Sequence, residues 1–131
     1  MTREEFEKLI EEEFAHAIPE KFRHHITNVG FLVEDEPDEE TRKLEHLGPH
    51  ETLLGLYRGI PYPARGDWYG MGSTMPDTIT LYQKPIEEEG AHVGDIRKVI
   101  RETIWHEVAH LFGMDEHTVR AREFKRDNHH D

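Results

Sequence analysis

The residues best suited to chemistry in this sequence are two histidines and a glutamate in the segment H-E-V-A-H, residues 106–110. On a helix, His106 and His110 lie one above the other on the same face, because they are four residues apart. Two imidazoles placed in this way can bind one Zn²⁺ ion through nitrogen. The spacing therefore predicts a zinc site on a helix, with His106 and His110 as two of its ligands.

Glu107 lies between the two histidines in the sequence and projects to one side of the pair on a helix. Zinc lowers the pKa of a bound water to about 7, and a neighbouring carboxylate can then take a proton from that water. We therefore expect Glu107 to act as a general base in hydrolysis and not as a metal ligand.

A tetrahedral zinc site needs a further protein ligand, and three candidates follow the motif directly. Gly113 can reverse the chain after the helix, which would bring the next residues back toward the ion. Glu116 is the first choice for the third ligand. His117 is an alternative because imidazole is a good zinc donor, and Asp115 is another, although it could instead cap a final helix.

The elements that must position these residues follow from the pattern of apolar residues. Short apolar runs rich in β-branched residues predict strands over residues 29–33, 53–57 and 79–82. Capping residues and helical spacing predict helices over residues 2–17, 41–47, 95–112 and 115–126. The segment 59–78 is rich in glycine and proline, which predicts a long loop that is either functional or a packed tether.

Composition limits the functions that the chain can have. The 131 residues fit one domain over residues 1–131, and cysteine is absent, which excludes disulfides and thiolate chemistry. The formal charge of −12 disfavours binding to nucleic acid. No apolar run approaches the roughly 20 residues that cross a bilayer. The first residues also lack the apolar core of a signal peptide, so we expect a cytoplasmic protein without a membrane partner.

Most other charged residues are expected to be solvated. The acidic runs at 11–13, 34–40 and 87–89 are predicted to lie on exposed faces. Arg97, Lys98 and Arg101 mark the polar side of the helix that carries the histidines, and we expect them in solvent.

The segment H-E-V-A-H-L-F-G-M-D-E, residues 106–116, resembles the active-site helix of the minimal zincin family, a group of small bacterial zinc metallopeptidases. Three further segments are similar to other stretches of that family: F-L-V-E-D-E-P (31–37), L-L-G-L-Y-R-G-I-P (53–61) and M-P-D-T-I-T-L-Y (75–82). The resemblance implies an α+β fold, in which a small sheet packs beside the active-site helix. The family usually has aspartate at the position of Glu116.

A zinc-dependent peptidase is therefore the leading hypothesis, with a peptide or protein as its substrate. Zincin sites generally hold an extended peptide by main-chain pairing with an edge strand near the helix. We expect that strand to come from residues 79–83 or 53–57.

Two other functions remain as alternatives. One is a binding or regulatory module whose metal site is vestigial, since a metal site does not by itself establish turnover. The other is a metal-dependent ribonuclease, because small rRNA-processing metalloproteins carry H-G-x-x-H-x-x-G-x-D-H. This chain differs from that pattern at Glu107, and its His117 falls one residue too late.

Overall fold

The computed structural model describes residues 1–23, 29–59 and 77–112. Within them lie five helices and one three-stranded sheet, so the α+β fold class is confirmed. Most of the predicted loop over 59–78 and all of the predicted helix over 115–126 lie outside the described residues.

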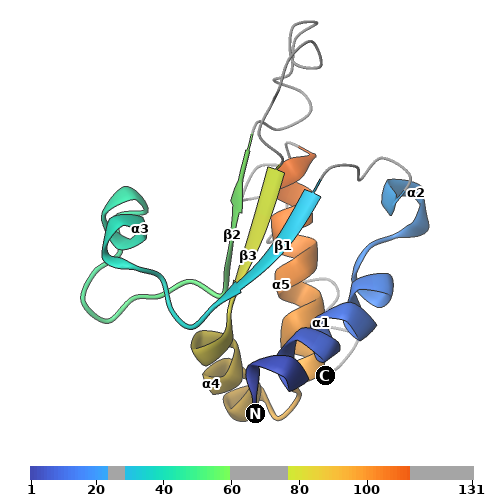
Figure 1. Cartoon of the computed structure of the whole chain (residues 1–131), viewed down its shortest axis with the longest axis horizontal. Helices are drawn as coiled ribbons and strands as arrows, with labels where there is room; N and C mark the ends of the chain where they lie inside the picture. The colour runs from blue at the N-terminus through green and yellow to red at the C-terminus, as the bar shows by residue number, and fades with distance from the viewer. Residues whose placement is uncertain (24–28, 60–76, 113–131) are drawn as a thin grey trace, which may run out of the picture.

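The sheet contains strands β1 (Val29–Glu34), β2 (Gly55–Arg58) and β3 (Asp77–Tyr82) in the order β1-β3-β2. β1 is parallel to β3, whereas β2 is antiparallel to it (Figure 1). Each predicted strand is present with shifted ends. Because β3 is central, β1 and β2 are the two edge strands of the described sheet.

Helix α1 (Arg3–Ala17) begins at the predicted capping box. The side chain of Thr2 accepts a hydrogen bond from the Glu5 amide at 3.1 Å, and the Glu5 carboxylate accepts one from the Thr2 amide at 3.0 Å. The short helix α2 (Glu20–Arg23) follows directly after Pro19, as expected for a proline whose missing N–H is tolerated at the start of a helix.

Two helices differ from the sequence prediction. α3 (Glu39–Leu44) begins before the predicted 41–47 segment, because the Asp38 side chain caps it by accepting from the Thr41 amide at 2.7 Å. α4 (Gln83–Val93) was not predicted. β3 ends at Tyr82, and Pro85 lies in the first turn of α4, where proline costs no hydrogen bond.

Helix α5 (Ile96–Leu111) carries the H-E-V-A-H segment and organises the core. It packs against α1, α4, β2 and β3, and in Figure 1 it runs behind the sheet. Its inward face buries Val99, Ile100, Ile104 and Val108 against residues of α1, β3 and α4. The histidine motif is therefore built on the most extensively packed helix of the described fold.

Arg97 is exposed, as expected, whereas Arg101 is half-buried, and both join α5 to α1. Their guanidinium groups donate to the two oxygens of Glu13 at 2.7 and 2.8 Å, and Glu13 is only 5% exposed. The prediction that the whole acidic run at 11–13 is solvated was therefore wrong for Glu13. Burial alone raises the pKa of Glu13, but the hydrogen bonds and charges of Arg101 and Arg97 outweigh it and hold the pKa below its ordinary value.

We expect Glu13→Gln to lower the free energy of unfolding by about 1–2 kcal/mol at pH 7, because it replaces two charge-assisted hydrogen bonds with weaker ones. The pKa of Glu13 is lower in the folded state, so its ion pairs contribute fully above the ordinary value of 4.5 and are lost as pH falls through the lowered pKa. Urea denaturation at several pH values should show that the difference in unfolding free energy from wild type shrinks as pH falls through the lowered pKa of Glu13. Glu11→Gln, an exposed position on the same helix, should show no such difference.

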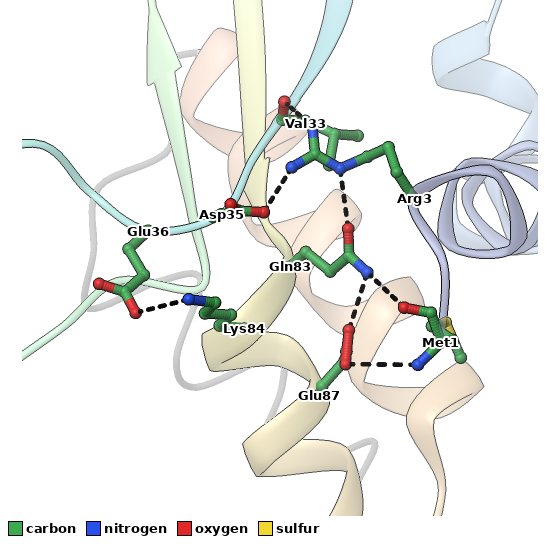
Figure 2. A network of polar contacts seen from close by, with 8 residues as sticks. All are labelled: Met1, Arg3, Val33, Asp35, Glu36, Gln83, Lys84 and Glu87. Carbon is green, nitrogen blue, oxygen red and sulfur yellow. Dashed lines mark hydrogen bonds and ion pairs between the residues drawn. The ribbon is translucent and has the colours of Figure 1, made fainter.

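A polar network fixes the start of α1 against β1 and α4 (Figure 2). Arg3 donates to the Gln83 side chain at 2.8 Å, to the Val33 carbonyl at 2.9 Å and to the Asp35 carboxylate at 2.5 Å. Gln83 in turn donates to Glu87 one turn further along α4 at 2.8 Å. The network ties together the N-terminus, the end of β1 and the start of α4.

Candidate metal centre

The two histidines lie in the last two turns of α5, as predicted from their spacing. The centroids of the His106 and His110 rings are 4.9 Å apart, and both side chains are half-buried. Both rings therefore lie on one face of the helix and remain within reach of solvent. This arrangement can offer two nitrogen ligands to one metal ion.

Glu107 is held by the neighbouring edge strand. Its side chain is 7% exposed, and its Oε1 atom accepts a hydrogen bond from the backbone N–H of Tyr57 at 2.9 Å. Tyr57 lies in β2, next to the central strand β3. Because its backbone N–H bonds to Glu107, it points away from β3 and toward α5. The carboxylate thus has a fixed position between α5 and the sheet edge.

Gly55 makes this close approach of β2 and α5 sterically feasible, and sequence analysis missed it. A Cβ atom at Gly55 would lie 2.9 Å from the Thr103 methyl group, 3.1 Å from the Thr80 carbonyl oxygen and 3.2 Å from Cγ of Glu107. A glycine inside an apolar strand often marks a close approach of another element, and that pattern could have identified it.

We expect Gly55→Ala to destabilise the protein by about 1–3 kcal/mol, since the added methyl group overpacks the contact between β2 and α5. The strand must move away from the helix, which weakens the bond between the Tyr57 amide and Glu107. Hydrogen exchange should then show faster exchange at the Tyr57 amide.

Gly30→Ala is the matched control, because a Cβ atom at Gly30 of β1 meets nothing within 4 Å. We expect it to leave stability and the exchange of the Tyr57 amide unchanged. Equal effects of the two substitutions would show that Gly55 has no special steric role.

An aromatic cluster covers the side of α5 next to the histidines. The Phe22 ring of α2 lies 5.7 Å from that of Trp105 and 5.0 Å from that of Phe112, between centroids. Trp105 is 4% exposed, and its Nε1 atom has no hydrogen-bond partner among the described residues. These contacts restrain the last turns of α5, and therefore the histidines that those turns carry.

The described residues include two of the candidate metal ligands, His106 and His110. No group of three histidine, aspartate or glutamate side chains that could hold a metal occurs within residues 1–23, 29–59 and 77–112. The three candidates for the third ligand, Asp115, Glu116 and His117, lie outside the described residues. The donor set that is present, two imidazoles on one helical face with a carboxylate beside them, fits a zinc ion.

The structure decides between the two expected edge strands. The segment 79–83 belongs to the central strand β3 and the first residue of α4, so it cannot be an edge. β2 is the edge strand that packs against α5 and bonds to Glu107. The other expected segment, 53–57, therefore overlaps the edge strand beside the histidine motif, which runs from Gly55 to Arg58.

The sequence matches the family of zincin-like metallopeptidases over residues 26–126. The chain belongs to this family, as the resemblance of its H-E-V-A-H helix indicated. The family implies a metal, typically zinc, and a peptide or protein substrate. None of the curated proteins matches the chain in sequence. In the part of the chain that the structure describes, no helix has the length and apolar character needed to cross a membrane.

Proposed function

We propose that the protein is a zinc-dependent peptidase in which His106 and His110 bind the metal and Glu107 is the general base. The observation that supports this most strongly is the buried Glu107 carboxylate, held by the β2 amide on the same helix as the histidine pair. A surface pair of histidines with no catalytic role would not require a fixed carboxylate beside it.

A bound zinc ion supplies Lewis acidity and lowers the pKa of water to about 7. The Glu107 carboxylate takes a proton from the attacking water and later gives it to the leaving amine. The hydrogen bond from the Tyr57 amide orients the carboxylate, so little reorganisation is needed during proton transfer.

β2 is the proposed binding strand for the substrate. Its amide at Tyr57 faces away from β3, so the strand presents an outer edge on the side where Glu107 lies. Because the Tyr57 amide is bonded to Glu107, an extended peptide would pair with the other outward-facing main-chain groups of that edge. Its scissile bond would then lie close to the base.

We propose Glu116 as the third ligand. We expect Glu116→Ala to weaken zinc affinity by at least about tenfold, a loss already typical when only the neighbours of metal ligands are changed. His117→Ala should have little effect. Competition with a chelating dye measures both affinities, and the reverse pattern would assign the ligand to His117.

The function is tested by assaying one zinc-loaded preparation against casein-derived peptides and against structured RNA. We expect peptide cleavage that stops when a chelator removes zinc and returns when zinc is restored. Cleavage of RNA but not peptide would support the ribonuclease alternative. Zinc binding without cleavage of either substrate would support a binding or regulatory module.

A further inference from the structure

A groove lies between α1 and β1, at the edge of the sheet opposite to β2. Its cavity has a volume of about 640 Å³. Six apolar residues line it: Ile10, Phe14, Val29, Phe31, Leu32 and Val33. Since β3 separates β1 from β2, this groove is distinct from the candidate metal centre.

The backbone of β1 presents hydrogen-bonding groups toward this groove. Arg3 donates to the carbonyl oxygen of Val33, so that oxygen faces away from β3. Backbone groups alternate in direction along a strand, and those of Phe31 therefore face the same way. Arg3 already occupies the Val33 oxygen, so a further strand would pair with the edge before it, at Phe31, a recurring mode of peptide recognition.

Large apolar side chains beside the outer edge of β1 remain partly exposed. Leu32 is 49% exposed although it is large and apolar. Phe14 of α1 packs edge-on against Phe31 of β1, with ring centroids 5.1 Å apart, and both remain only half-buried. An added strand would cover these side chains and remove apolar surface from water.

Two carboxylates give the groove a negative rim. Glu7 and Glu11 are one turn apart on α1, both are exposed, and both line the cavity. Neither is ion-paired with a cation in the described part of the chain. A cationic occupant is therefore favoured. A second copy of this chain is disfavoured, because it would bring the same carboxylates and a further charge of −12.

We propose that this groove binds an extended segment of a partner protein in which apolar side chains alternate with lysine or arginine. The segment would pair with the outer edge of β1. Leu32 points to the opposite face of the sheet from Phe31, so the apolar side chains of the segment would contact Leu32. Its cationic side chains, on the α1 face, would lay their stems along Phe14 and reach Glu7 and Glu11. The site would act independently of the metal centre.

The test uses a blocked octapeptide of alternating valine and lysine, titrated into the full-length protein by calorimetry at physiological salt. We expect binding to the wild type, and an affinity about tenfold lower for the double variant Glu7→Gln, Glu11→Gln, since each exposed charge pair contributes modestly. The double variant Glu88→Gln, Glu89→Gln makes the same charge change at exposed positions of α4. It should bind within about twofold of the wild type.

Two further measurements test whether the peptide adds as a strand and whether it binds in this groove. A peptide with N-methylated amides at alternate positions should bind at least about tenfold more weakly, because it cannot complete the backbone ladder. His106→Ala should bind the octapeptide as the wild type does, which distinguishes this groove from a substrate site at β2.

The proposal is overturned by three outcomes. Equal losses in the two double variants would indicate general attraction to an acidic surface. Absence of peptide binding to the wild type would show that the groove does not take such a segment. A wild-type dimer that Leu32→Lys dissociates in sedimentation would assign the groove to a second copy of the chain.

Discussion

Glu107→Gln is expected to lower kcat/KM for peptide cleavage by about 10²–10⁴-fold, the usual contribution of a general base. The amide cannot take up a proton at neutral pH. Its carbonyl oxygen can still accept the hydrogen bond that Oε1 now accepts from the Tyr57 amide, so the fold should be retained. Peptide kinetics measure kcat/KM, and zinc titration of the same preparation measures the affinity for the metal.

Zinc affinity is the control within that experiment, because Glu107 is proposed as base and not as ligand. We expect the affinity of Glu107→Gln for zinc to stay within about threefold of wild type, since the loss of a side chain that supports a metal ligand typically costs about tenfold or more. Glu88→Gln, an exposed glutamate of α4, should leave both activity and zinc affinity unchanged. Unchanged peptide cleavage by Glu107→Gln would refute the role of general base.

Substitution of either histidine should have the largest effect on the metal. We expect close to one zinc ion per wild-type chain and almost none in His106→Ala or His110→Ala, because one imidazole and one carboxylate rarely hold zinc. Elemental analysis after dialysis measures the zinc content. His92→Ala, an exposed histidine of α4, should retain the metal. Equal zinc in all four proteins would place the ion elsewhere.

The helix of the site could be predicted from sequence because its pattern is local. The four-residue spacing of His106 and His110 determines a shared helical face, and the apolar stripe determines which face is buried. The structure confirms the helix and its burial, with its ends within one residue of the predicted range. Strand positions followed for the same reason, since each strand is a short apolar run.

The surroundings of the site could not be predicted, because they depend on contacts between distant residues. The bond from Tyr57 to Glu107 spans 50 positions, and the space around Gly55 depends on the packing of α5. Glu13 resembles its solvated neighbours in sequence, yet Arg97 and Arg101 lie more than 80 positions away and bury it. Strand order is also non-local, and only the structure identifies β2 as the edge beside the motif.

The most direct test of the account is a crystal structure of the zinc-loaded protein with anomalous data at the zinc edge. We predict one strong peak at about 2.0–2.1 Å from a nitrogen of His106 and of His110, the usual zinc–imidazole distance. Glu116 should supply the third protein ligand, and Glu107 should lie outside the coordination shell. A peak away from the histidine pair, or Glu107 bound directly to the ion, would contradict the proposed metal centre.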